Sequence, residues 1–281
     1  MSHKGFLTMP RVRRFLAGAA AVSVIVYAGI TAAMYAKQRD LLFNTQDTGG
    51  LSKAGALAIE GGVRVVIPTP DGERLAGWYL APKSGQPTFL FFHGKGGGLE
   101  KKKWRWKRLR EHGDGVLAIS YRGYPGSTGS ASEAGLMTDA RAAYDWLIAR
   151  GHKADDIVLH GLSLGTGVAT ELATQVPARA LILEAPYTAV VDVAAERYPW
   201  LPVGWLMRDP FLTRDKIAKV KIPVLIAHGT GDTVIPYQHA ERLYALARQP
   251  KVLARFEGSD HSTLVRDGLY EKHVWPFLTR D

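Results

Sequence analysis

Cysteine is absent from this chain of 281 residues. Disulfide bonds, a thiolate nucleophile and cysteine-ligated metals are therefore excluded, and so is any hydrolase that works through a cysteine. The sequence also shows no clustering of histidines and carboxylates that would predict a catalytic metal, and no cofactor is expected. Internal repeats and long low-complexity linkers are lacking as well, so we expect one folded domain with a short extension.

Charge is absent from one long stretch near the N-terminus. Residues 15–36 are uncharged and, at about 1.5 Å each, extend roughly 33 Å, which is enough to cross a hydrocarbon core of about 30 Å. Basic residues without an acidic one precede this stretch. The positive-inside rule then places residues 1–14 in the cytoplasm and residues 37–281 on the far side of the membrane, in a periplasmic, extracellular or lumenal space.

The alternative to this transmembrane anchor is a cleaved signal peptide, which would give a secreted protein. Small residues at Thr31-Ala32-Ala33 would suit such a cleavage. The apolar stretch is longer than the usual signal core of about 7–15 residues, however, and this favours the uncleaved anchor.

Positive charge is in excess, with a formal net charge of +10, and much of it lies in residues 101–110. Leu99, Trp106 and Leu109 share one helical face there, and this face should pack on the core. The cations between them fit either a solvated helix face or a contact with anionic lipid headgroups, where each basic group adds about 1 kcal/mol. No motif for reading nucleic acid accompanies them, so nucleic acid is not an expected partner.

Short apolar runs alternate with longer amphipathic segments through the rest of the chain. Two early strands flank the turn Pro70-Asp71-Gly72 and form a hairpin. Strands are expected at 63–67, 75–80, 88–92, 116–120, 157–160, 181–183, 223–228 and 251–256. Helices are expected at 101–110, 133–150, 166–175 and 237–247, and near the C-terminus. This alternation predicts an α/β fold with a mostly parallel central sheet covered by helices on both faces.

One motif in this pattern carries chemistry, namely Gly161-Leu162-Ser163-Leu164-Gly165. It follows a predicted strand directly and precedes a predicted helix. The flanking glycines keep side chains out of a sharp strand-to-helix bend, and the bend exposes the Ser163 hydroxyl. Because a serine hydroxyl is a weak nucleophile near neutral pH, it needs a base, and the base needs an orienting acid.

Candidates for the acid and the base follow later strands, in an order that is typical of proteins with such nucleophile turns. Asp232 lies in a tight loop after one strand, and His261 lies after the next, both at the carboxyl ends where α/β folds place their sites. We therefore assign Ser163 as nucleophile, His261 as general base and then acid, and Asp232 as the orienting carboxylate. Glu184, which ends an earlier strand, is the alternative acid, whereas Asp260 is too close to His261 in sequence to face it well.

The remaining histidines have less suitable positions. His228 ends a strand and is typical of a packed, hydrogen-bonded residue. His239 falls in a predicted helix, and His273 lies near the C-terminus.

An oxyanion hole requires two backbone N–H groups near the nucleophile. One should belong to Leu164, the residue after Ser163, and the other to the glycine-rich loop 93–98 that follows an early strand. We assign the second donor to the main chain of Lys95. The alternative is a flexible glycine loop with no chemical role.

The segment 187–215 interrupts the alternation of strands and helices and occupies the place where a cap over the site is inserted. It contains aromatic and apolar residues that would line an acyl-chain pocket or contact lipid. The candidates are Tyr187, Trp200, Leu201, Trp205 and Leu206. Ordinary packing is the alternative role for them.

These motifs resemble those of the α/β-hydrolases with a serine nucleophile, and more narrowly a membrane-anchored branch that includes monoacylglycerol lipases and protein depalmitoylases. The resemblance runs from about Tyr35 to the C-terminus. The matching segments are Phe92-His93-Gly94, Ser120-Tyr121-Arg122-Gly123-Tyr124, Gly161-Leu162-Ser163-Leu164-Gly165, Tyr198-Pro199-Trp200-Leu201-Pro202-Val203, His228-Gly229-Thr230-Gly231-Asp232 and His261. One departure is Lys95, because relatives usually carry a small polar residue after His-Gly.

The resemblance implies an α/β-hydrolase fold with a small cap insertion and a serine hydrolase acting on carboxylic esters or thioesters. Acyl-chain or lipid-like substrates are expected, with the membrane as a partner through the N-terminal helix and the segment 101–110. The alternatives are a peptidase or amidase of the same fold, and a catalytically silent, membrane-bound interaction module.

Overall fold

The computed structural model describes residues 9–45, 61–96, 99 and 102–279. The strands are β1 Val63–Pro68, β2 Arg74–Leu80, β3 Thr88–Phe92, β4 Gly115–Ile119, β5 Ile157–Leu162, β6 Ala180–Glu184, β7 Val224–Gly229 and β8 Lys251–Phe256. The α-helices are α1 Met9–Phe43, α2 Lys103–His112, α3 Glu133–Ile148, α4 Leu164–Ala173, α5 Val190–Arg197, α6 Val203–Leu206, α7 Arg214–Ile217, α8 Gln238–Leu246 and α9 Trp275–Leu278. Short turns of other helix types, η2 Ala154–Asp156 and η3 Tyr270–Val274, complete the chain. The predictions for residues 1–8, Gly97, Gly98 and Lys101 lie outside the described residues.

The eight strands form one sheet in the order β1-β2-β4-β3-β5-β6-β7-β8. The β1–β2 pair is an antiparallel hairpin around the predicted turn, and β2 also runs antiparallel to β4, whereas β3 to β8 are parallel. Strands β3 to β7 are buried along their whole length, as expected when both faces of a sheet are covered. The predicted α/β architecture is confirmed.

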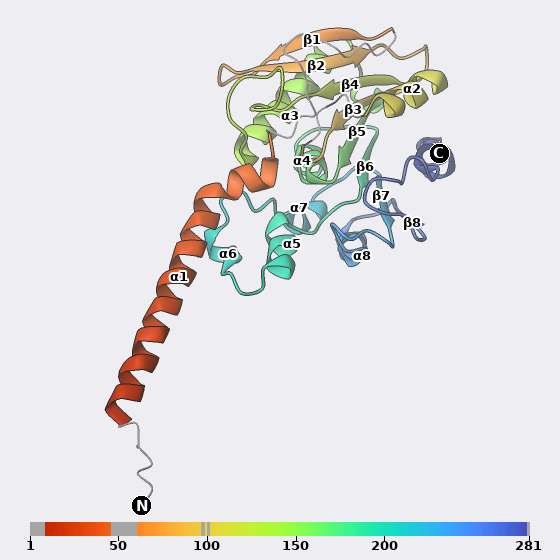
Figure 1. Ribbon diagram of the computed structural model, residues 1–281. Helices are drawn as coiled ribbons and strands as arrows, with labels where there is room; N and C mark the ends of the chain where they lie inside the picture. The colour runs from red at the N-terminus through yellow and green to blue at the C-terminus, as the bar shows by residue number, and fades with distance from the viewer. Residues whose placement is uncertain (1–8, 46–60, 97–98, 100–101, 280–281) are drawn as a thin grey trace, which may run out of the picture.

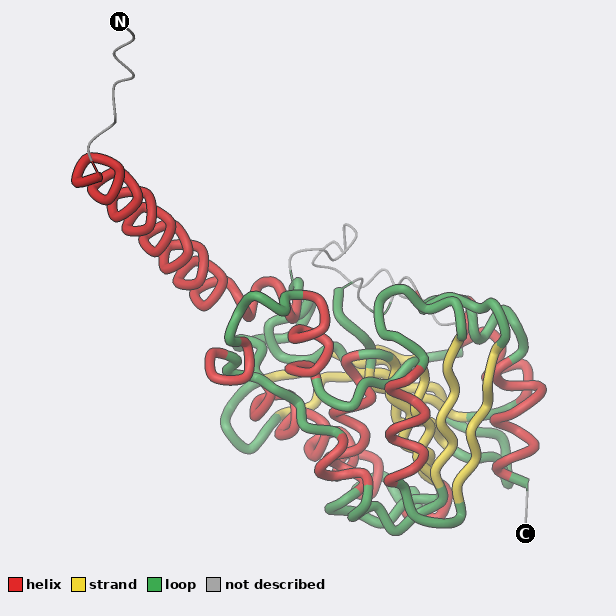
Figure 2. Tube along the Cα trace, turned by 90° about the horizontal axis from the view of Figure 1, so that it is seen from below, coloured by secondary structure: helices red, strands yellow, loops and turns green. Residues whose placement is uncertain are grey.

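Side chains that alternate along each strand enter two separate cores. In β3, Leu90 and Phe92 join the core beneath α3, α4 and α8, while Phe89 and Phe91 join the core beneath α2 and the C-terminal helices. Helices therefore cover both faces of the sheet (Figure 2). The carboxyl ends of the parallel strands remain open at one edge, where the segment 187–215 with α5 and α6 lies (Figure 1).

Helix α2 buries part of the basic segment. Trp106 and Leu109 are buried in the second core, as predicted. Arg105 differs from the expectation, because it is only 2% exposed and forms an ion pair with Glu184, so it cannot contact a lipid surface. In Figure 1, α2 also lies at the opposite end of the domain from α1. Headgroup contact by the other cations of the segment 101–110 stays a prediction.

Helix α1 is longer than the predicted anchor and ends inside the domain. The most hydrophobic window of its part Val12–Phe43 has a mean hydropathy of 2.0 and is not buried at all, so the helix has the character of a membrane span. At its end, Phe43 is buried and packs against the ring of Phe211. The helix leaves the domain beside α6 and extends away from it (Figure 1).

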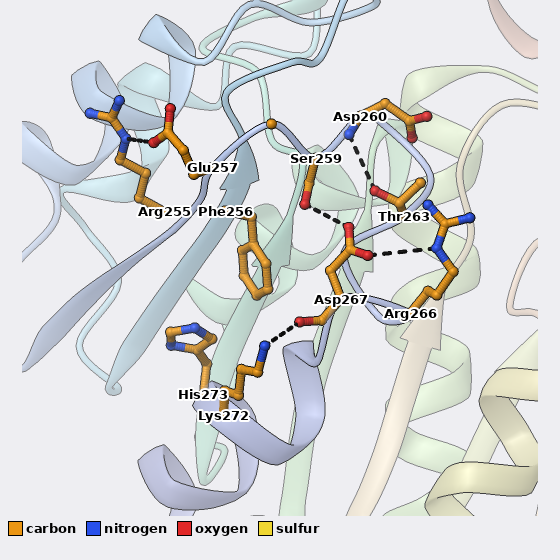
Figure 3. Close-up of a pocket in the computed structure, with 11 residues that line it drawn as sticks. Arg255, Phe256, Glu257, Ser259, Asp260, Thr263, Arg266, Asp267, Lys272 and His273 are labelled. Carbon is orange, nitrogen blue, oxygen red and sulfur yellow. Dashed lines mark hydrogen bonds and ion pairs between the residues drawn. The ribbon is translucent and has the colours of Figure 1, made fainter.

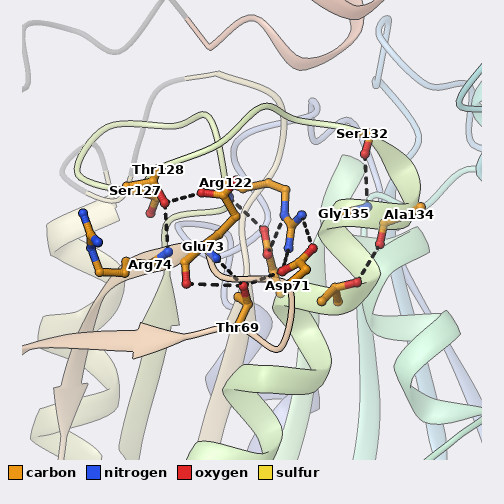
Figure 4. Close-up of polar contacts among 12 residues, drawn as sticks. Thr69, Asp71, Glu73, Arg74, Arg122, Ser127, Thr128, Ser132, Ala134 and Gly135 are labelled. Atoms are coloured by element: carbon orange, nitrogen blue, oxygen red, sulfur yellow. Dashed lines mark hydrogen bonds and ion pairs between the residues drawn. The ribbon is translucent and has the colours of Figure 1, made fainter.

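The loop after β4 ties the hairpin, α1 and the site together. Arg122 donates to Asp139 of α3 over 2.8 Å and to Asp71 of the hairpin turn over 2.7 Å (Figure 4). Two tyrosines of the same loop reach further. Tyr124 donates to the carbonyl of Phe43 at the end of α1 over 2.6 Å, and Tyr121 donates to the carbonyl of His93 over 3.2 Å.

Candidate active site

Ser163 lies at a tight bend between β5 and α4. Its backbone has φ 51° and ψ −119°, which a residue other than glycine rarely adopts and which marks functional turns. The glycines on either side are required by close packing. A Cβ on Gly161 would lie 2.4 Å from the carbonyl oxygen of Gly165, and a Cβ on Gly165 would lie 2.1 Å from that of Phe92. The bend therefore fixes Ser163 where the sequence pattern places a nucleophile.

The structure brings together the three side chains that the sequence singled out. Ser163 Oγ lies 2.9 Å from His261 Nε2, and His261 Nδ1 lies 2.7 Å from Asp232 Oδ2. With Nδ1 protonated, His261 donates to the carboxylate and its Nε2 is free to accept the serine proton. The segments that supply these groups follow β5, β7 and β8, all at the same edge of the sheet.

Asp232 is held as a buried carboxylate. Its side chain has no exposed surface, and Oδ1 accepts the backbone N–H groups of Val234 and Ile235 over 2.8 and 2.9 Å. Burial alone would raise the pKa of Asp232, but hydrogen bonds from His228 and His261 outweigh it and hold the pKa well below its usual value. Asp232 therefore stays ionised beside His261 at neutral pH.

His228 takes a position that the sequence only partly predicted. It is buried and hydrogen-bonded, as expected, but its Nε2 lies 3.0 Å from Asp232 Oδ2 and 2.9 Å from the carbonyl of Ile235. Two histidines thus meet one carboxylate oxygen. The four-residue spacing from His228 to Asp232, at the end of a buried strand, is the sequence signal for this contact.

The two alternative acids lie elsewhere. The Glu184 carboxylate receives two hydrogen bonds from Arg105, over 2.7 and 2.9 Å, and lies 3.1 Å from His160 Nε2. Burial opposes ionisation there, but the charge and hydrogen bonds of Arg105 hold the pKa of Glu184 well below its usual range. Asp260 accepts from the backbone of Ser262 over 2.8 Å. Both carboxylates have partners other than His261.

The loop after β3 passes directly over Ser163. A Cβ on Gly94 would lie 3.1 Å from Ser163 Cβ, so only a glycine fits without displacement. Lys95, the next residue, lines the same cavity as Ser163 and Leu164. Among the described residues, neither Lys95 nor Leu164 donates its backbone N–H to a carbonyl. Both residues therefore line the cavity of Ser163 without a backbone acceptor for their N–H groups among the described residues.

His93, at the start of this loop, is a neutral spacer. It is buried, and burial lowers its pKa to about 4. Its Nδ1 lies 2.8 Å from the carbonyl of Gly94, and its ring packs 4.3 Å from that of Tyr121. These contacts of the His93 ring hold the backbone of the loop in place.

A cavity of about 510 Å³ opens above Ser163, and apolar side chains form most of its lining. The candidates Tyr187, Leu201 and Leu206 belong to the lining. Trp200 and Trp205 do not. They lie outside the cavity, and Trp205 is 96% exposed. The sequence analysis missed the contribution of α1, whose lining residues are Met34, Tyr35, Gln38, Leu41 and Leu42.

A second, polar cavity of about 580 Å³ is lined by residues between Arg255 and His273 (Figure 3). Its polar side chains bond to one another, as in the Arg255–Glu257 pair and the hydrogen bond from Ser259 to Asp267. Ser163 does not line it. In the part of the chain that the structure describes, no group of three or more His, Asp or Glu side chains is placed to hold a metal.

Comparisons with known proteins point to one family. Residues 89–216 match a family model described as "Alpha/beta hydrolase family". The uncharacterized protein Rv2307c of Mycobacterium tuberculosis is 36% identical over 247 residues, which is 86% of each chain. Lysophosphatidylserine lipase ABHD12 of Danio rerio is 36% identical over 200 residues, which is 63% of this chain and 52% of that protein.

Solved structures share the fold at low sequence identity. An esterase from Pyrococcus furiosus superposes with a TM-score of 0.68 and 20% identity, over 81% of this chain and 94% of that one. An esterase from Exiguobacterium antarcticum gives a TM-score of 0.61 and 18% identity, over 78% of this chain and 100% of that one.

Proposed function

Because this chain belongs to the alpha/beta hydrolase family and is similar to solved esterases and to a lipase, we propose that it is a serine hydrolase of acyl esters or thioesters. The observation that carries the proposal is the continuous hydrogen-bonded line from Ser163 through His261 to Asp232. Three side chains from distant parts of the sequence form it, at the open edge of the sheet.

The proposed mechanism uses each group in turn. Ser163 Oγ attacks the substrate carbonyl while His261 Nε2 takes its proton, and Asp232 stabilises the resulting imidazolium. The N–H groups of Leu164 and Lys95 stabilise the oxyanion, a contribution typically of about 3–4 kcal/mol for one such donor. His261 then protonates the leaving alcohol or thiol, and water hydrolyses the acyl-enzyme.

The cavity favours a lipid-like acyl substrate. Apart from two cations, Lys95 and Arg197, its described lining is apolar or uncharged, and no carboxylate is present to hold the amino terminus of a peptide. The cations suit an anionic head group, and the related Danio rerio protein is named as a lysophosphatidylserine lipase. A single-chain phospholipid ester is therefore the substrate class that we propose first, ahead of peptides and amides.

A fluorophosphonate probe tests the nucleophile in the full chain in detergent. We expect the wild type to be labelled and Ser163→Ala to lose labelling. Ser262→Ala, which removes an exposed serine next to His261, is the matched control and should be labelled like the wild type. Equal labelling of Ser163→Ala and the wild type would refute the assignment, and absence of labelling in folded wild type would favour a silent fold.

Faster relative turnover of aminoacyl amides than of p-nitrophenyl esters would favour a peptidase.

We also propose that α1 anchors the protein in a membrane with its N-terminus in the cytoplasm, because Arg13 and Arg14 precede the apolar stretch. In right-side-out membrane vesicles, external protease should remove a C-terminal tag and spare an N-terminal one. The reverse pattern would overturn the orientation. A shortened protein that is released from the membrane would show instead that a signal peptide is cleaved.

A further inference from the structure

The end of α1 is built into the wall of the substrate cavity. Met34 and Leu41 line the same cavity as Ser163, although more than 120 residues separate them in sequence. Helix α1 is continuous from Met9 to Phe43. The apolar helix that would cross a membrane therefore also borders the space in front of the nucleophile.

Polar contacts fix this part of α1 against the segment 187–215. The Gln38 side chain donates to the carbonyl of Leu206 over 3.2 Å and accepts the N–H of Arg208 over 2.7 Å, as a backbone strand would. Arg39 makes a two-point ion pair with the buried Asp209, over 2.7 and 3.1 Å. These contacts hold the end of α1 in place as part of the folded domain.

A contact nearer the N-terminus of α1 indicates how deep the domain lies in a bilayer. Tyr27 donates to the carbonyl of Trp200 over 3.0 Å, and the two rings meet edge to face at 6.3 Å. Tyr27 lies thirteen residues beyond Arg14, which is about 20 Å along a helix axis. A hydrocarbon core is about 30 Å thick. With Arg14 at the cytoplasmic boundary, the Tyr27–Trp200 contact lies about 10 Å inside the opposite boundary, and any helix tilt places it deeper.

The surface around this contact suits that depth. Trp205, on α6 beside α1, is 96% exposed, and Trp200 is 50% exposed. Exposed tryptophans are costly in water and favourable where a membrane meets water or lipid tails. The two tryptophans that the sequence analysis placed in the pocket lie outside it instead, and Trp200 contacts Tyr27 of the anchor.

We propose that Trp200 and Trp205 lie within the far leaflet of the membrane, and that the α1 wall formed by Met34 and Leu41 receives an acyl chain directly from that leaflet. The substrate is then an ester lipid that resides in the bilayer rather than a soluble ester. This inference rests on the proposed esterase function for its substrate, while the depth of the domain rests on the proposed anchoring of α1 and on the Tyr27–Trp200 contact.

Immersion is tested without any catalytic readout. Because the chain has no cysteine, Trp205→Cys accepts a single environment-sensitive NBD label. Lys221→Cys is the control, since Lys221 is exposed and precedes the amino end of β7, at the sheet edge opposite the site. In phosphatidylcholine vesicles, the label at 205 should shift its emission to the blue and lose most of it to lipids with a nitroxide on the acyl chain. The label at 221 should do neither. Water-like, unquenched emission at position 205 would overturn the immersion.

The wall is tested by its effect on acyl-chain length. Met34→Trp fills cavity space beside the nucleophile, so hydrolysis of p-nitrophenyl palmitate relative to butyrate should fall by about tenfold. Ile30→Trp, on an exposed position of the same helix that does not line the cavity, should keep the wild-type ratio. An unchanged ratio in Met34→Trp would refute the wall. Absence of Ser163-dependent probe labelling in the wild type would instead refute the esterase, and the NBD result would still stand.

Discussion

Two buried carboxylates lie near Ser163, and only one is connected to it through a histidine. Glu184 ends β6 and Asp232 follows β7, each side chain is buried, and each touches a histidine of a strand. The backbone of Glu184 is even bonded to the nucleophile, because Ser163 donates its N–H to the Glu184 carbonyl over 2.9 Å. Its side chain, however, faces Arg105 of α2 on the other side.

The difference lies in what neutralises each charge. A guanidinium is always protonated, so the Arg105–Glu184 pair is a fixed ion pair that contributes to the fold. Asp232 has only histidines and backbone N–H groups as partners, and one of those histidines also reaches Ser163 Oγ. In the proposed mechanism Asp232 suits catalysis because its partner can gain and lose a proton, and burial alone does not distinguish the two carboxylates.

The largest expected effect is on activity, where Asp232 and Glu184 should differ most. Asp232→Asn should lower kcat/KM for an ester substrate by about 10³–10⁴, because the amide no longer holds the His261 tautomer or stabilises its cation. Glu184→Gln should leave the activity per folded molecule close to that of the wild type. Both rates are normalised to folded protein measured by circular dichroism. A comparable loss in both variants would mean that Glu184 also acts on the reaction.

The next largest effect is on stability, and here the Glu184 site should matter more than the Asp232 site. Arg105→Met should lower the free energy of unfolding by about 3–5 kcal/mol, because Glu184 would remain as a buried charge without its cation. Lys107→Met is the matched control on the same helix, since its pair with Glu111 is exposed, and such pairs contribute about 0–1 kcal/mol. Denaturant titration in detergent micelles measures both. Equal, small losses would show that the buried pair adds little.

Acid should weaken both sites in the same direction. The folded-state pKa values of Asp232 and Glu184 both lie below their usual values. Their stabilising contributions are therefore complete above the ordinary carboxylate pKa near 4, and they are lost as the pH falls below it, by at most about 1.4 kcal/mol per pH unit for each group. Unfolding titrations between pH 5 and pH 3 should show this slope. Glu184→Gln and Asp232→Asn should each flatten it, and a slope unchanged in both would contradict the assigned shifts.

The sequence predicted the sheet, the bend at Ser163 and the positions of Asp232 and His261, because each depends on a local pattern. Apolar runs identify buried strands, and the carboxyl ends of parallel strands meet at one edge. Local patterns did not show which way the Glu184 side chain faces. Two neighbouring strand residues point to opposite faces, so the choice depends on the position of α2.

The role of α1 was hidden for a related reason. Its apolar composition predicts a membrane span, and the same composition suits the wall of a lipid pocket. Nothing in the local sequence says that Met34 lines the same cavity as Ser163, because that arrangement depends on the whole chain between them. Arg105 illustrates the converse error. It lies in a basic run that looks solvated, but tertiary packing buries it against Glu184.

The smallest expected effect is that of replacing the two histidines that accompany the carboxylates. His228 and His160 are both fully buried strand residues, the first beside Asp232 and the second beside Glu184. His228→Phe removes one donor to Asp232, which keeps its backbone donors and His261, so kcat should fall by about tenfold while KM stays unchanged. With one donor fewer, the Asp232 carboxylate attracts the His261 proton more strongly, and the acidic limb of the kcat/KM profile should move to higher pH. His160→Phe should lower stability and leave both kcat and the pH profile as they are. A normal profile in His228→Phe would mean that this histidine only fills space behind the orienting carboxylate.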